Sequence, residues 1–162
     1  MSLVVPFDGS ALSKAALVRA AQFDTVLDEG IHVVTVIPKH NETYARERGW
    51  IDRTSSYDTD TIVAQLRTEV ERIAPSASFH HLFVDRHAPR GTIAGRIRQF
   101  AREHDATIVF IGSENAGRII NAITVGQSVA GDRSYDTFIV TGETLPVIEK
   151  LKSAVSTDEA NR

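Results

Sequence analysis

The apolar residues of this chain alternate between two spacings, and that alternation limits the folds open to it. Short runs rich in β-branched residues are typical of buried strands, whereas apolar residues three and four positions apart are typical of helices. Strands are predicted over residues 3–7, 31–37, 79–84, 106–111 and 137–141. Strand then helix, repeated four times before a fifth strand, predicts an α/β fold: an open five-stranded parallel sheet with helices on both faces.

The first helix is expected from Ala11, with Leu12, Ala16, Ala20 and Phe23 as its buried stripe. Further helices are expected from Asp58 or Asp60 to Pro75, over residues 92–104 and over residues 118–130.

Residues 39–57 show no clear periodicity. A stretch of this length is long for a compact domain, so it is either a functional loop or contains an irregular helix. Residues 1–142 are expected to form one domain, and residues 143–162 a C-terminal helix with a polar tail.

The composition excludes several classes of protein. The chain has no cysteine, which excludes disulfides, zinc–thiolate sites and thiol catalysis. Its 18 basic and 21 acidic residues give a net charge of −3, which argues against nucleic-acid binding through a basic surface. The apolar runs are too short to cross a membrane, and the N-terminus does not resemble a signal peptide. We therefore expect a cytoplasmic protein that binds neither nucleic acid nor membranes.

Ligands of open parallel sheets bind beyond the carboxyl ends of the strands. In this sequence the loops at that edge begin at Asp8, Pro38, Asp85 and Gly112. The Asp8 carboxylate could accept a hydrogen bond from a ligand's amino group. Alternatively, Asp8 and Ser10 around Gly9 only stabilise the start of the first helix.

The loop that begins Gly112-Ser113-Glu114-Asn115-Ala116-Gly117, with Arg118 after it, suits an anion, because glycines let a phosphate approach the main chain. Glu114 would repel a phosphate unless it faces away. Gly126 either breaks the predicted helix, or the helix begins near Ser128 and the whole preceding segment is one loop.

Arg86, His87, Arg90 and Arg118 are predicted at the same rim, where together they would suit a polyphosphate. The alternative is that each is a solvated surface charge.

No metal site is predicted. His80 and His81 are neighbours on a strand and therefore face opposite sides of the sheet. Asp58 and Asp60 lack the continuation of a calcium loop, so helix capping is their expected role.

No catalytic signature is present in the sequence. It has neither a G-x-G-x-x-G motif after the first strand nor a G-x-S-x-G nucleophile elbow. We therefore expect a protein without dedicated catalytic machinery. For slow nucleotide hydrolysis, His87 is the candidate base.

Several segments resemble the universal stress protein family. They are Leu3-Val4-Val5-Pro6-Phe7-Asp8-Gly9-Ser10 before an alanine-rich helix, Val33-Val34-Thr35-Val36-Ile37-Pro38, and Asp105-Ala106-Thr107-Ile108-Val109-Phe110-Ile111-Gly112-Ser113. The resemblance implies a Rossmann-like, adenine nucleotide alpha-hydrolase-like fold with strand order 3-2-1-4-5. It also implies a homodimer joined through the last strand.

The resemblance further implies binding of ATP or another adenine nucleotide, with Mg accompanying the phosphates. Asp8 and the backbone of Val36 would hold adenine, and Gly112 with the following loop would hold ribose and phosphates. The complete set of candidate nucleotide-binding residues is Asp8, Gly9, Ser10, Val36, Arg86, Gly112, Ser113, Asn115, Gly117, Arg118, Gly126, Gln127 and Ser128.

This sequence departs from the ATP-binding pattern of the family at three points. Asn115 stands in place of the second glycine, and ten residues instead of nine separate it from Gly126. Gln127 stands where serine or threonine is expected. The alternative function is therefore a dimeric interaction scaffold of the non-ATP-binding branch, with a vestigial pocket. In either case we expect a stress-response protein with an unknown protein partner.

Overall fold

A five-stranded parallel sheet forms the centre of the computed structural model, which describes residues 1–112 and 129–142. The strand order is β3-β2-β1-β4-β5, as the family resemblance implies. The bounds of the strands are β1 Ser2–Pro6, β2 Ile31–Pro38, β3 Ser78–Val84, β4 Ala106–Gly112 and β5 Asp136–Val140. Each differs from its predicted range by no more than one residue at either end, and β3 and β5 lie at the edges of the sheet.

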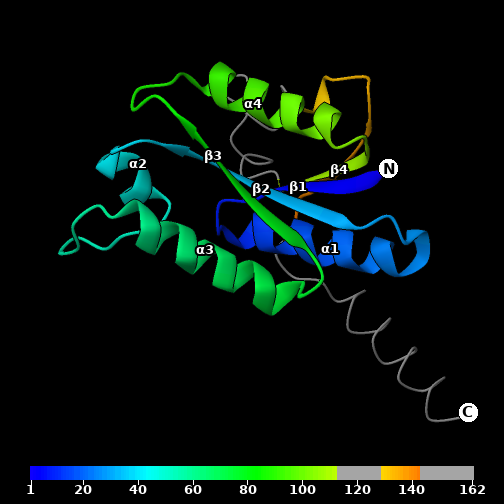
Figure 1. The fold of residues 1–162 in the computed structure, drawn as a ribbon, viewed down its shortest axis with the longest axis horizontal. Helices are drawn as coiled ribbons and strands as arrows, with labels where there is room; N and C mark the ends of the chain where they lie inside the picture. The colour runs from blue at the N-terminus through cyan, green and yellow to red at the C-terminus, as the bar shows by residue number, and fades with distance from the viewer. Residues whose placement is uncertain (113–128, 143–162) are drawn as a thin grey trace, which may run out of the picture.

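Helices cover both faces of this sheet, as predicted (Figure 1). One face carries α1 and α3, and the other carries α4. The helices of the described segments are α1 Ala11–Leu27, α2 Glu42–Glu47, α3 Thr59–Ile73 and α4 Arg90–Glu103. Of the two predicted caps, Asp58 is the one that begins α3, and its side chain accepts a hydrogen bond from the Asp60 amide. The helix expected from residue 92 begins two residues earlier.

The core is divided by the sheet into two clusters. Leu3 and Val5 face α1 and α3, whereas Val4 between them faces α4. All three are fully buried, because successive side chains of a strand point to opposite faces and both faces are covered.

The predicted buried stripe of α1 is partly wrong. Its buried residues are Ser13, Ala15, Ala16, Leu17 and Ala20. Leu12 is only partly buried, and Gly112 lies against the backbone of this turn. Phe23 remains 37% exposed, although its ring packs edge-on against Phe110 with the centroids 5.2 Å apart.

Residues 39–57 contain the short helix α2, so one of the two expectations for this stretch is confirmed. The predicted helix over 118–130 lies mainly outside the described residues, and residues 143–162 lie wholly outside them.

Candidate functional site

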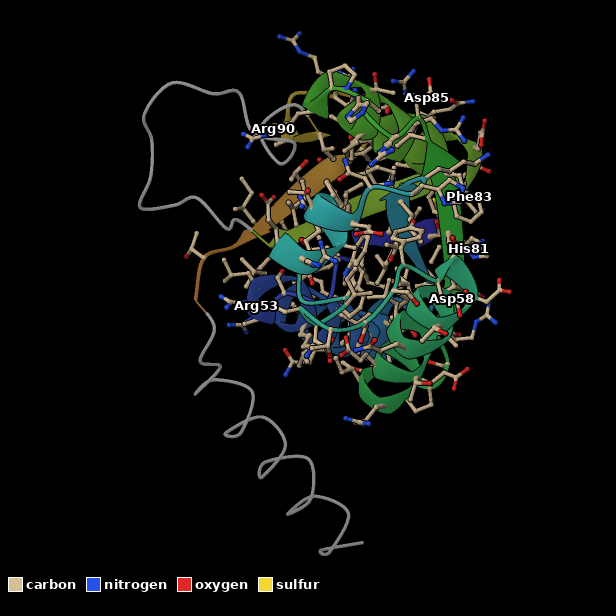
Figure 2. All side chains as sticks on the ribbon, turned by 90° about the vertical axis from the view of Figure 1, so that its left-hand side faces the viewer. Arg53, Asp58, His81, Phe83, Asp85 and Arg90 are labelled. Carbon is tan, nitrogen blue, oxygen red and sulfur yellow. The ribbon has the colours of Figure 1, made fainter. Side chains whose placement is uncertain are left out.

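The loops after β1, β2 and β3 and the last residue of β4 meet at one edge of the sheet, which we call the carboxyl edge. Figure 2 looks onto this edge, with Asp85 and Arg90 beside α4, and with Arg53 and Asp58 toward α1 and α3. Two hydrogen bonds join neighbouring loops here. The Lys39 amide donates to the Val84 carbonyl at 3.0 Å, and the Asn41 side chain donates to the Arg86 carbonyl at 2.7 Å.

The turn after β1 is fixed by its own polar side chains. The Ser10 amide donates to the Asp8 carboxylate at 2.9 Å, and the Ser13 amide donates to the Ser10 hydroxyl at 3.2 Å. Gly9 has φ +79°, a left-handed conformation that glycine adopts without strain. The helix-stabilising role considered for Asp8 and Ser10 is therefore present. It also holds the carboxylate at the start of α1, where the amides of the first turn lie.

The backbone of Val36 lies just beyond the part of β2 that pairs with β1. The Phe7 amide donates to the Val34 carbonyl at 2.9 Å, and this bond follows the last paired residues of β1 and β2. Because the direction of backbone groups repeats every two residues, the N–H and C=O of Val36 also point toward the β1 side. The chain turns away there at Asp8, and the Phe7 carbonyl accepts the hydroxyl of Thr35 at 2.7 Å.

Gly112 allows the end of β4 to lie directly against the first turn of α1. A Cβ atom at this position would lie 2.5 Å from the carbonyl carbon of Leu12 and 2.7 Å from the Ser13 nitrogen. Only glycine permits such an approach. The contact brings the end of β4 next to the N-terminus of α1, the positive end of that helix's dipole.

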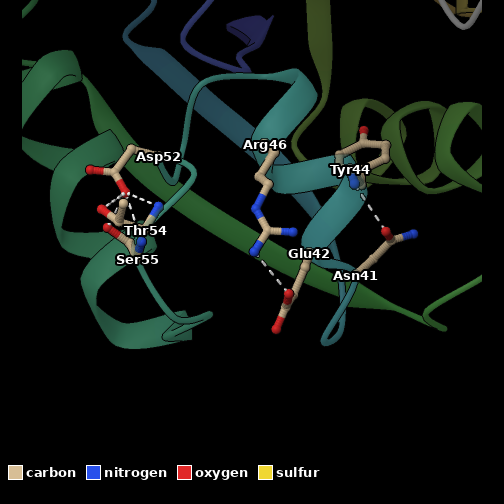
Figure 3. Close-up of polar contacts among 7 residues, drawn as sticks. All are labelled: Asn41, Glu42, Tyr44, Arg46, Asp52, Thr54 and Ser55. Atoms are coloured by element: carbon tan, nitrogen blue, oxygen red, sulfur yellow. Dashed lines mark hydrogen bonds and ion pairs between the residues drawn. The ribbon is translucent and has the colours of Figure 1, made fainter.

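The segment after β2 contacts the turn at Asp8, although none of its residues was predicted to belong to the site. Trp50 is 6% exposed, and its indole N–H donates to the Asp8 carbonyl at 2.7 Å. Asn41 caps α2 by accepting a hydrogen bond from the Tyr44 amide at 2.9 Å (Figure 3). The Arg48 guanidinium lies over the Tyr44 ring, 3.4 Å from its centroid. The signal available in the sequence was a tryptophan and two tyrosines inside a mostly polar stretch.

Asp52, in the same segment, accepts four hydrogen bonds (Figure 3). Its Oδ1 accepts from the hydroxyl and amide of Ser55 and from the hydroxyl and amide of Thr54. These bonds lower the pKa of Asp52 to about 2, with the Ser55 hydroxyl as the largest cause. Asp52 therefore orders the loop that leads from α2 to α3.

The basic side chains predicted at this rim are exposed where the structure describes them. Arg86 and His87 lie in the turn after β3, and Arg90 is the first residue of α4. Among the described residues, none of the three belongs to an ion pair. The structure thus brings Arg86 to the same edge as Asp8, Gly9, Ser10, Val36 and Gly112. The remaining predicted site residues lie outside the described segments, and these are Ser113, Asn115, Gly117, Arg118, Gly126, Gln127 and Ser128.

A comparison with models of protein families gives one match for this sequence. The model of the universal stress protein family matches residues 1–130. The chain belongs to the universal stress protein family. None of the curated proteins matches the sequence.

Solved universal stress proteins share the fold of this chain. One, solved in complex with cAMP, superimposes with a TM-score of 0.56 at 19% identity, covering 86% of this chain and 95% of the other. A universal stress protein from Archaeoglobus fulgidus in complex with dAMP gives a TM-score of 0.51 at 19% identity, covering 87% and 98%. Another structure from Archaeoglobus fulgidus gives 0.56 at 19% identity, covering 87% and 93%. Within the described segments, no helix of this universal stress protein is long and apolar enough to cross a membrane.

Proposed function

We propose that this protein is a cytoplasmic, nucleotide-responsive regulatory module of the stress response, which binds ATP or another adenine nucleotide and has no dedicated catalytic machinery. The observation that carries the proposal is the convergence of the Asp8 turn, the Val36 backbone and Gly112 at the carboxyl edge of the sheet. Family membership and the nucleotides named for two structures of the same fold support it.

The adenine base is assigned to the position beyond the end of β1, beside Val36 of β2. A carboxylate at Asp8 accepts a hydrogen bond from an amino group, and the N–H and C=O of Val36 supply a donor and an acceptor for the edge of a base. Both groups belong to rigid parts of the molecule, since Val36 is a strand residue and the Asp8 turn is fixed by Ser10. A base held this way directs its ribose toward the N-terminus of α1 and the end of β4.

The phosphates are assigned to Gly112 and the loop that follows it. The helix dipole and the first-turn amides of α1 favour an anion beside Gly112, and Arg86 adds positive charge at the same edge. Any Mg ion would accompany the phosphates. Occupancy would shift the loops that begin at Asp85 and Gly112, and so alter the surface offered to a protein partner.

Binding is tested by calorimetry and thermal unfolding with ATP, ADP and AMP. A ligand at about 100 times its dissociation constant stabilises the native state by about 2.7 kcal/mol. Asp8→Asn keeps an oxygen for the Ser10 amide but removes the charge, and we expect it to weaken binding about tenfold or more, because a hydrogen bond to a charged group contributes about 1.5–3 kcal/mol.

Asp28→Asn is the matched control. Asp28 ends α1 at the opposite edge of the sheet with φ 51°, a conformation that asparagine tolerates. Absence of any shift with the three nucleotides at millimolar concentration would contradict the proposal. An equal loss of affinity in both variants would contradict the role of Asp8.

A dimeric interaction scaffold with a vestigial pocket is the second candidate. It is favoured by the departures at Asn115, Gln127 and the glycine spacing. In both candidates we propose that β5 joins two copies, because it is an edge strand and its Ile139 is 51% exposed. Sedimentation of Ile139→Lys should show monomers where the parent chain is dimeric. Phosphate density beside Gly112 in crystals grown with nucleotide would exclude the vestigial pocket.

A further inference from the structure

Three histidines from separate elements meet at the edge of the sheet opposite the candidate nucleotide site. His32 lies near the start of β2, His80 lies in β3, and His104 is the C-cap of α4. The pairing of β2 with β3 places His80 beside Val34, two residues after His32. Both side chains therefore lie on the sheet face that α4 covers.

Their nitrogen atoms are close enough to share one ion. One ring nitrogen from each histidine lies within 4.8 Å of the other two. The Nδ1 of His32 and the Nε2 of His80 are 3.0 Å apart and share a hydrogen bond, whose proton a metal ion would displace. Ligand nitrogens around a tetrahedral zinc ion at 2.0–2.1 Å are separated by about 3.3 Å. Side-chain rotations that shorten the separations by at most about 1.5 Å would bring the set to that geometry.

His104 is oriented by a hydrogen bond from its other ring nitrogen. Its Nδ1 lies 2.9 Å from the Phe100 carbonyl, which can only accept, so Nδ1 donates to it and Nε2 is the nitrogen left to face a metal ion. Metal-bound histidines commonly donate their second ring N–H to a carbonyl in this way. The His104 ring also stacks on Phe100, with the centroids 3.9 Å apart, and the C-terminus of α4 favours a cation.

The other two imidazoles are biased toward their neutral forms. Burial is the largest cause that lowers the pKa of both His32 and His80. His104 and the N-terminal amine lower the pKa of His32 further, and the neighbouring histidines lower that of His80. A neutral imidazole is the form that coordinates metals. All three side chains remain partly exposed, so an ion can reach them.

We propose that His32, His80 and His104 bind one divalent transition-metal ion of the zinc class. Neutral nitrogen ligands favour Zn²⁺, Ni²⁺, Co²⁺ or Cu²⁺ over Mg²⁺ and Ca²⁺, which prefer oxygen. Three protein ligands leave at least one coordination position for water. The site is separate from the carboxyl edge and does not depend on nucleotide.

Titration calorimetry with zinc chloride tests the site, using metal-free protein without a histidine tag and without nucleotide, which would itself chelate zinc. We expect saturable binding of one zinc per chain. His80→Gln should weaken it by at least about tenfold, since even the loss of an outer-shell partner costs about 10- to 100-fold. His81→Gln is the matched control, because His81 is the next residue of β3 and lies on the other face, 5.3 Å from the Phe83 ring (Figure 2).

Nitrogen-15 spectra of the histidine rings give a second measurement on the unaltered chain. One equivalent of zinc should shift the ring nitrogens of His32, His80 and His104, and leave those of His40 and His87 in place. Absence of saturable zinc binding would overturn the proposal and identify the cluster as aromatic packing. Equal weakening by His80→Gln and His81→Gln, or zinc-induced shifts confined to other histidines, would also overturn it.

Discussion

Replacing Gly112 by alanine tests the contact between the end of β4 and the first turn of α1. The added Cβ would lie 2.5 Å from the Leu12 carbonyl carbon, 2.6 Å from its oxygen and 2.7 Å from the Ser13 nitrogen. Carbon atoms in contact prefer about 3.5–4.0 Å, so backbone must move by about 1 Å. All three atoms belong to backbone, so no side chain can rotate to relieve the overlap.

The cost follows from the general behaviour of overpacked interiors. Inserting a methyl group into a filled site costs about 1–3 kcal/mol. Gly95→Ala is the matched control, because Gly95 lies inside α4 and a Cβ there meets nothing within 4 Å. Alanine is favoured over glycine inside a helix by about 0.5–1 kcal/mol. The free energies of unfolding of the two variants should therefore differ by at least about 1.5 kcal/mol, with opposite signs relative to the parent chain.

Urea unfolding measures this difference. With a slope of about 2 kcal/mol per molar urea, the midpoints of the two variants should lie at least about 0.7 M apart. Nucleotide affinity of Gly112→Ala should fall as well, because the displaced backbone separates β4 from the start of α1. If Gly112→Ala unfolds at the parent midpoint while Gly95→Ala is stabilised, Gly112 does not lie against Leu12 and Ser13. The inference that β4 ends beside the N-terminus of α1 would then be wrong.

Two further predictions concern polar groups near this edge. The Asp52 carboxyl should titrate at about pH 2 in carbon-13 spectra, because Ser55 and Thr54 donate to its ionised form, and Ser55→Ala should raise that midpoint. The hydrogen bonds to the ionised Asp52 contribute fully to stability above the ordinary pKa of 3.8, and this contribution is lost as pH falls through about 2. A titration midpoint near 3.8 in the parent chain would refute the predicted lowering of the Asp52 pKa. Thr35→Val should lower the free energy of unfolding by about 1–2 kcal/mol, because it leaves the buried carbonyl of Phe7 without its 2.7 Å partner. An unchanged urea midpoint would show that this bond contributes nothing.

The strands could be predicted from the sequence because their burial is nearly complete. In β1 and β2, runs such as Val33 to Ile37 are covered on both faces, which requires continuous apolar sequence. The stripe of α1 was harder to predict, because the residues against the sheet are small. Ala16 and Ala20 permit a close approach, whereas the larger Phe23 packs at the margin and stays partly exposed.

Only those residues of the candidate nucleotide site that lie at or near the carboxyl end of a strand could be predicted from the sequence. Asp8 and Gly112 could be placed at the carboxyl edge from the sequence because both directly follow apolar runs. Trp50 was not assigned to the site, because the helix before it has only six residues, too few to show a period. The contact of its indole with the Asp8 carbonyl spans 42 positions, and no local pattern reports such a distance.

The histidine cluster could not be predicted from the sequence either, because it joins residues that are far apart along the chain. Metal motifs are recognised by short spacings within one element, but His32 and His80 are 48 positions apart and meet through strand pairing.

The two edges of the sheet are linked by a rigid element, which restricts how they can influence one another. His32 and Val36 lie on the same strand and the same face, about 13 Å apart at about 3.3 Å per residue. Hydrogen bonds to β1 on one side and to β3 on the other hold this strand in one register. Coupling between two sites requires an element that both can bias between two states. Metal at the histidine cluster would therefore leave adenine recognition by Val36 unchanged, and any response to nucleotide must arise in the loops of the carboxyl edge.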